Sequence, residues 1–108
     1  MLKKLFLVSL LFTASSIQAE TVFASWYETG SITANGEKFH PDGLTVAHKK
    51  LPFGTKLRLT RNGKSIVVRV NDRGPFIEGR TLDLSRGAAK ALGCIHSGVC
   101  KLKMSVEG

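Results

Sequence analysis

Residues 56–71 read KLRLTRNGKSIVVRVN and carry the clearest local structural signal of the chain. Polar and apolar residues alternate on both sides of Asn62-Gly63, as they do in two strands that each bury one face. Asn-Gly accepts positive φ at both central positions of a tight turn, so the two runs predict a β-hairpin. The alternation in the second arm sends three residues toward the core (Ile66, Val68, Val70) and three away from it (Val67, Arg69, Asn71).

The rest of the chain carries further short strand patterns and one helix pattern. β-branched, aromatic and alternating apolar residues predict strands over residues 22–27, 44–48, 81–85 and 100–106. Ser85 is a suitable N-cap for a short helix over residues 87–92, which Gly93 ends. The Gly-rich residues 28–41 predict turns or a loop. Six short strands with one or two short helices indicate a mainly β fold, a small closed or nearly closed barrel.

The N-terminus has the pattern of a secretory signal. Lys3 and Lys4 precede an apolar run over residues 5–12, and Ala19 is a small residue at a plausible cleavage point. The run is shorter than the ~20 residues that span a bilayer, so a stable membrane anchor is the weaker interpretation. We expect a signal peptide over residues 1–19 and one periplasmic or secreted domain over residues 20–108.

Two cysteines, Cys94 and Cys100, lie in the expected mature domain. In an oxidising compartment they are expected to form a disulfide. Two Cys without clustered His residues make an incomplete zinc shell, so a metal site is not expected, and no cofactor is suggested.

The formal net charge is +8, spread as single Lys and Arg residues. Such a surface suits a polyanion, and outside the cytoplasm that means wall polymer or membrane surface and not nucleic acid. The alternative is that the charge serves solubility alone.

Four titratable residues stand where no structural pattern requires them: Glu37, His48, Asp72 and Asp83. Cleavage of a glycosidic bond needs an acid for the leaving oxygen and stabilisation of an oxocarbenium-like centre. A carboxylic acid of raised pKa with a further carboxylate or His supplies these roles. The raised pKa requires partial burial, for which nearby residues are available: Pro75, Phe76 and Tyr27.

Each candidate also has an ordinary structural interpretation. Asp72 can cap the turn that follows it. Asp83 can pair with Arg69 or Arg80 across a sheet face. Glu37 can be a solvated loop acid, and His48 a hydrogen-bonded residue at a strand end.

Trp26 and Tyr27 form an aromatic pair in the first strand. Aromatic rings stack on sugars, so both are candidate groove residues. The alternative is that they are half-buried core residues.

Several segments together resemble the rare-lipoprotein-A family. They follow in order through the expected mature chain: ASWY (24–27), TANGEKF (33–39), LTVAHK (44–49), LP (51–52), VRVNDRGPF (68–76), RTLDLS (80–85) and AA (88–89). The NDRGPF segment is the most specific of these.

The resemblance implies a double-psi β-barrel, a fold shared with expansins. It also implies an endolytic lytic transglycosylase, which cleaves peptidoglycan between N-acetylmuramic acid and N-acetylglucosamine and leaves a 1,6-anhydro end. Matched by position, Asp72 is the catalytic acid, Glu37 the second acid, and His48 and Asp83 supporting residues. Asn71 and Arg73, beside Asp72, are expected to contact substrate.

The expected partner is the glycan strand, bound by a monomer. Two alternatives remain open. One is a non-catalytic, peptidoglycan-binding or expansin-like wall-loosening module, and the other is a secreted effector or inhibitor that acts on another cell's wall.

Overall fold

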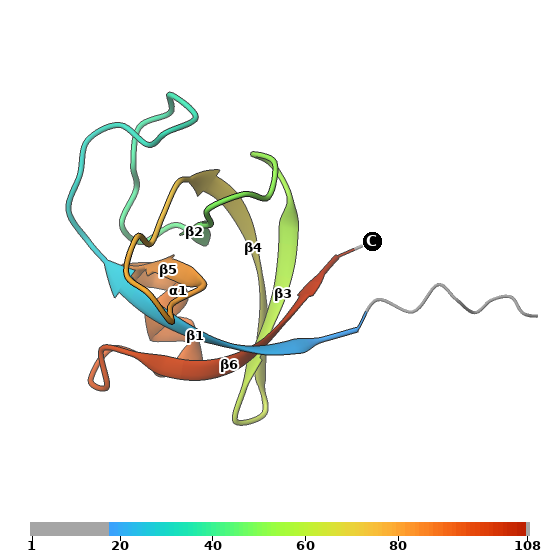
Figure 1. Cartoon of the computed structure of the whole chain (residues 1–108). Helices are drawn as coiled ribbons and strands as arrows, with labels where there is room; N and C mark the ends of the chain where they lie inside the picture. Colours follow the sequence, from blue (N-terminus) through green and yellow to red (C-terminus); the bar gives the residue numbers. More distant parts are fainter. Residues whose placement is uncertain (1–17, 108) are drawn as a thin grey trace, which may run out of the picture.

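The computed structural model describes residues 18–107, and within this range the chain folds into six strands and one helix (Figure 1). The expected signal peptide lies outside the described residues except for its last two positions. The elements are β1 (Glu20–Tyr27), β2 (Thr45–Ala47), β3 (Lys56–Arg61), β4 (Lys64–Asp72), β5 (Leu82–Ser85), α1 (Arg86–Leu92) and β6 (Cys100–Val106). The prediction of a small, mainly β barrel with six strands is confirmed.

The strands close into one barrel in the order β1-β5-β2-β4-β3-β6. Two pairs, β1 with β5 and β2 with β4, are parallel, and the other neighbours are antiparallel. A parallel pair needs a crossover, because the chain must return to the starting end of the sheet. The loop between β1 and β2 extends from the barrel as a long excursion, seen at the upper left of Figure 1.

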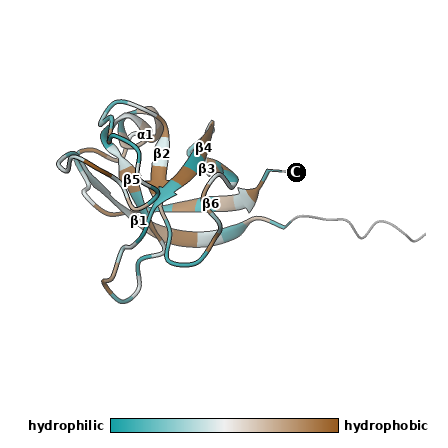
Figure 2. Ribbon diagram, turned by 90° about the horizontal axis from the view of Figure 1, so that it is seen from above, coloured by the Kyte–Doolittle hydropathy of each residue, from teal (hydrophilic) through white to brown (hydrophobic). Residues whose placement is uncertain are grey.

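The central hairpin forms as predicted. β3 pairs with β4 from Lys56↔Arg69 to Arg61↔Lys64, which leaves Asn62 and Gly63 as the turn with φ of 49° and 79°. Its inward residues are fully buried: Leu57, Leu59, Val68 and Val70. Figure 2 shows apolar, brown stretches along the barrel strands. The register therefore follows from which face is apolar.

Helix α1 follows β5 without a loop. The Ser85 hydroxyl accepts a hydrogen bond from the Ala88 amide, and Gly93 ends the helix with φ 73°. Arg61 donates from Nη1 to the carbonyl oxygens of Leu92 and Gly93, and so satisfies the helix C-terminus from the β3–β4 hairpin. Both predicted caps are confirmed.

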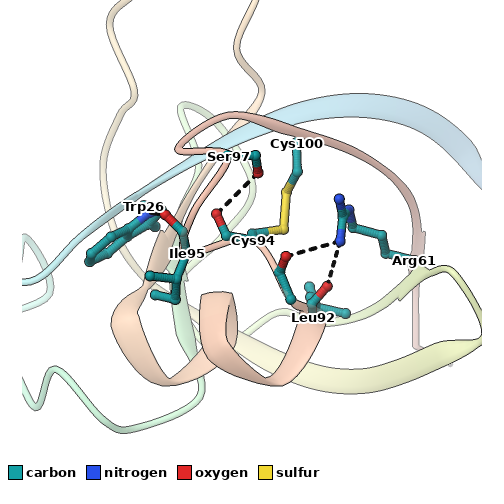
Figure 3. The surroundings of a disulfide bond; sticks show 8 residues. Trp26, Arg61, Leu92, Cys94, Ile95, Ser97 and Cys100 are labelled. Carbon is teal, nitrogen blue, oxygen red and sulfur yellow. Dashed lines mark hydrogen bonds between the residues drawn. A yellow bond between two sulfur atoms is a disulfide. The ribbon is translucent and has the colours of Figure 1, made fainter.

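The Cys94–Cys100 disulfide is present and staples the loop between α1 and β6 (Figure 3). Closing so short a loop stabilises by about 2 kcal/mol in the chain-entropy model. In β6, Cys100, Leu102 and Met104 are buried as predicted, whereas Val106 at the strand end is exposed.

Candidate active site

Asp72 ends β4, and its carboxylate is held by donors from three segments. Oδ1 accepts from the Ala34 amide at 2.9 Å and from the Arg73 amide at 3.0 Å. Oδ2 accepts from the Tyr27 hydroxyl at 3.0 Å. The turn-capping interpretation of Asp72 is thus correct in part, but the other two bonds tie it to β1 and to the β1–β2 loop.

Tyr27 is positioned by stacking. Its ring lies parallel to that of Phe39, with centroids 4.7 Å apart and an interplanar angle of 9°. Burial, the hydrogen bond to Asp72 and the nearby carboxylate charges raise the pKa of the Tyr27 phenol. The hydroxyl therefore stays protonated at neutral pH and donates to Asp72.

Glu37 is not a free loop acid. It accepts from both terminal nitrogens of Arg69, at 3.0 and 2.7 Å, and from the amides of Asn35 and Asn71 at 3.0 Å each. Bonds from Arg69, Asn71 and Asn35 lower the pKa of the Glu37 carboxyl to about 2. Glu37 is therefore ionised at neutral pH, and its hydrogen bonds fix the loop that carries Ala34.

Asn71 lies next to Asp72 and is 1% exposed. Its Nδ2 donates to Glu37, and its Oδ1 is buried and lacks a hydrogen-bond partner among the residues that the structure describes. In this structure the side chain is almost fully buried, and its bond to Glu37 helps to hold that carboxylate. The substrate contact expected from the sequence stays a prediction.

Arg73 holds the loop that follows β2. Its Nη1 donates to the carbonyl oxygens of His48 and Leu51, at 3.1 and 2.9 Å, and its guanidinium lies 3.9 Å over the Phe53 ring. These contacts use two of its five N–H donors and one face of its guanidinium, and they hold the loop; the expected substrate contact of Arg73 stays a prediction.

His48 begins that loop as a hydrogen-bonded residue at a strand end. Its Nδ1 accepts from the amides of Lys50 and Leu51 at 3.0 and 3.1 Å, which leaves the proton on Nε2. Burial, followed by the charge of Arg73, lowers the pKa of His48, so the imidazole is neutral at pH 7.

Asp83 lies on β5, separated from Asp72 on β4 by the strand β2. In the sheet, Ala47 is opposite Asp72 on one side and Asp83 on the other. Asp83 accepts from the Ser25 hydroxyl at 3.1 Å, and burial raises the pKa of its carboxyl while the Asp72 charge adds to the rise. The pairing of Asp83 with Arg69 does not form, because Arg69 binds Glu37; Arg80 acts on Asp83 as a nearby charge.

The two candidate groove aromatics differ. Trp26 donates from Nε1 to the Ile95 carbonyl at 3.3 Å and packs against the core beside the disulfide loop (Figure 3). Tyr27 faces Asp72. The core interpretation therefore fits Trp26, and the site interpretation fits Tyr27.

Phe76, a residue expected from the sequence to shield the acid, is 80% exposed. A side-chain carbon on Gly74 would lie 3.4 Å from the Phe76 ring, so the ring rests over Gly74. Most of the ring is open to solvent. The expectation that Phe76 buries Asp72 is wrong, because the turn carries the ring outward.

Phe39, Arg69 and Ser25 belong to the site and are not singled out by the sequence patterns. Arg69 carries a signal, since the alternation of β4 places it on the same outward face as Asn71. Within residues 18–107 no three His, Cys, Asp or Glu side chains gather closely enough to hold a metal ion. Asp72 is placed to exchange a proton with a bound substrate. Asp83, a second carboxyl, whose pKa is raised, lies on the other side of β2.

Solved structures with the same architecture define the class of fold. A papain inhibitor from Streptomyces superposes with a TM-score of 0.72, at 22% identity, over 85% of this chain and 97% of its own. A mutant expansin from Clavibacter michiganensis, solved in complex with cellohexaose, gives a TM-score of 0.70 at 22% identity, over 84% of this chain and 51% of its own. The barrel is a double-psi β-barrel.

The family described as "Lytic transglycolase" matches residues 19–104. The chain belongs to this family. The probable endolytic peptidoglycan transglycosylase RlpA of a Nostoc species is 57% identical over 81 residues, which are 73% of this chain and 22% of the relative. The endolytic peptidoglycan transglycosylase RlpA of Pseudomonas aeruginosa is 52% identical over 90 residues, 79% of this chain and 26% of the relative. The chain thus spans about a quarter of the length of these relatives.

Among the helices of the described residues, none is long and apolar enough to cross a membrane.

Proposed function

We propose that this domain is an endolytic peptidoglycan transglycosylase that acts outside the cytoplasm, where its polymer substrate lies. The observation that carries the proposal is the Asp72 carboxylate, held by Tyr27, Ala34 and Arg73 in a member of the lytic transglycolase family. The names of the relatives support the reaction and the polymer.

Asp72 acts as both acid and base in this proposal. Oδ1 is occupied by two amides, whereas Oδ2 accepts a single hydrogen bond and keeps a lone pair for substrate. Protonated Asp72 gives its proton to the leaving oxygen as the bond to C1 of N-acetylmuramic acid breaks. The muramoyl 6-hydroxyl then bonds to C1 and returns its proton to Asp72, so no water is consumed.

The other residues assist without exchanging protons with substrate. Glu37 orients the loop that delivers the Ala34 amide, and Tyr27 fixes the direction of Oδ2. Asp83 is a second carboxyl near C1, and its ionised form stabilises the positive charge that develops there. Neutral His48 anchors the loop at the edge of the site. The open face of Phe76 offers a surface on which a sugar ring can stack.

Mass spectrometry of the soluble products from purified domain and peptidoglycan tests the reaction. The proposal predicts fragments that end in 1,6-anhydro-N-acetylmuramic acid. Fragments with reducing ends would indicate a hydrolase.

The second candidate is a binding or wall-loosening module, favoured by the basic charge and the exposed Phe76. It predicts that the domain sediments with peptidoglycan and releases no fragments. Sedimentation measured in parallel therefore separates the two.

A further inference from the structure

A basic pocket of about 190 Å³ lies beside the two aspartates. It is lined by His48, Lys49, Lys50, Arg80 and Thr81. The residues come from the segment that leaves β2 and the segment that enters β5, and these two strands run antiparallel with Ala47 opposite Asp83. Continuing that register places the pocket directly next to the Asp72–Asp83 site.

The positively charged side chains of this pocket, Lys49, Lys50 and Arg80, form no ion pair with the described residues. Within residues 18–107, no carboxylate oxygen lies within 4.0 Å of the side-chain nitrogens of Lys49, Lys50 or Arg80. The other arginines with close carboxylates are elsewhere: Arg58, Arg69 and Arg86 pair with Glu107, Glu37 and Asp42, respectively. Three cations without an ion pair among the described residues line this pocket, and together they create a positive potential that attracts an anion.

His48 adds an uncharged hydrogen-bond donor to these charges. His48 uses Nδ1 as an acceptor, so Nε2 remains a donor at the pocket wall. Burial and the charges of Arg73, Lys49 and Lys50 lower the pKa of His48, opposed by Glu20, which fits a site of positive potential. Arg80 also acts on Asp83 as a nearby positive charge, so part of the field of that aspartate is offset by Arg80 at the edge of the pocket.

We propose that this pocket binds a carboxylate of the peptidoglycan strand next to the bond at Asp72. The inference rests on the proposed function for its substrate. Peptidoglycan offers this chemistry from two sources, the lactyl carboxylate of muramic acid without a stem peptide and the carboxylates of the stem peptide itself. In both cases the pocket holds the muramoyl side of the strand against the site, and so sets the register of cleavage.

The test compares Lys49→Gln/Lys50→Gln with a matched control, Lys64→Gln/Lys103→Gln. All four lysines are exposed, and both variants lose two positive charges. Lys64 starts β4 at the end opposite Asp72, and Lys103 pairs with Thr60 near the same hairpin. Affinity is measured by sedimentation with intact peptidoglycan, with amidase-treated peptidoglycan that lacks stem peptides, and with both after conversion of carboxylates to methylamides.

We expect the pocket variant to bind at least one of the two polymers with unconverted carboxylates about 5- to 10-fold more weakly than the control variant does. This is the loss expected when two exposed charge contacts are removed. Methylamide conversion should remove this difference. A difference that appears or grows after amidase treatment assigns the lactyl carboxylate, which the amidase exposes, and a difference lost with the stem peptides assigns the peptide carboxylates. Equal binding by the two variants on every polymer overturns the inference.

The two proposals fail separately. If wild type releases anhydro products and both variants bind equally, the proposed reaction is supported and the proposed role of the pocket is contradicted. If binding depends on carboxylates and on Lys49 and Lys50 but no products are released, the role of the pocket is supported and the proposed reaction is contradicted.

Discussion

The Tyr27 hydroxyl, at the end of β1, donates a hydrogen bond to Asp72 Oδ2, at the end of β4, over 3.0 Å. The two residues are 45 positions apart in the chain and meet because β1 and β4 lie on either side of the β5–β2 pair in the closed barrel. The bond leaves one lone pair of Oδ2 for a substrate. The closed barrel thereby orients the carboxyl that we propose as the catalytic acid and base.

Tyr27→Phe removes this bond and keeps the stack on Phe39. We expect kcat for release of anhydro products to fall about 10-fold with little change in KM, because a bond to a charged group contributes about 1.5 kcal/mol. Phe39→Leu is the companion variant, which keeps the hydroxyl and loosens the ring. An unchanged kcat in Tyr27→Phe would show that the phenol does not aim Asp72.

Glu37→Gln tests the positioning role of Glu37 through pH. Its folded-state pKa of about 2 lies below the ordinary value of 4.5, so its contribution to stability is complete above pH 4.5 and is lost as the pH falls toward 2. Both partners are partly exposed, which limits the contribution to about 0.5–1 kcal/mol. Urea unfolding should therefore separate wild type from Glu37→Gln at pH 7 and bring them together near pH 2.

Arg69→Gln removes the partner of Glu37 and should reproduce this pH dependence. If the difference between wild type and Glu37→Gln persisted near pH 2, the ionised Glu37–Arg69 pair would not be its cause.

Phe76→Ala tests the sugar-stacking surface. Loss of one aromatic face should raise KM for glycan strands about 5-fold and leave kcat and the unfolding midpoint nearly unchanged, since the ring is exposed and stacking contributes about 1 kcal/mol. Val99→Ala, an exposed apolar residue in the disulfide loop, is the control. Equal KM values for the two variants would show that Phe76 does not contact the glycan.

Gly87→Ala probes how the helix is docked on the β1–β2 loop. The Gly87 amide donates to the Pro41 carbonyl at 2.8 Å, and a side-chain carbon at residue 87 would overlap the backbone carbonyl of Asp42. Alanine normally favours a helix, but here the overlap should destabilise the domain by about 1–3 kcal/mol. Lys90→Ala on the exposed face of the same helix should be near neutral, and a Gly87→Ala variant as stable as wild type would contradict the close approach.

The features predicted correctly from the sequence are mostly local. Asn62-Gly63 between alternating runs specifies the hairpin, and Ser85 and Gly93 bound the helix, because each acts on neighbours a few residues away. The cysteines pair across a six-residue separation. Such signals do not depend on how the barrel closes.

The site is predicted less completely, because its contacts join distant segments. Glu37 meets Arg69 across 32 positions, and that ion pair turns an expected second acid into a fixed anion. Asn71 is covered by the β1–β2 loop, which contacts it through Asn35 and Glu37, and Phe76 is exposed on the turn after β4; residue types do not reveal either. The family resemblance locates Asp72, whereas its donors require the structure.

The most direct measurement of the central claim is the mass spectrum of products from Asp72→Asn beside that of wild type, on the same peptidoglycan. Asparagine keeps an Oδ1 acceptor for the Ala34 and Arg73 amides but cannot transfer the proton. We expect a circular dichroism spectrum like that of wild type, retained sedimentation with the polymer, and loss of 1,6-anhydro-N-acetylmuramic acid products by at least about 1,000-fold. Anhydro products at the wild-type rate from folded Asp72→Asn would contradict the assignment of Asp72 as the catalytic acid and base.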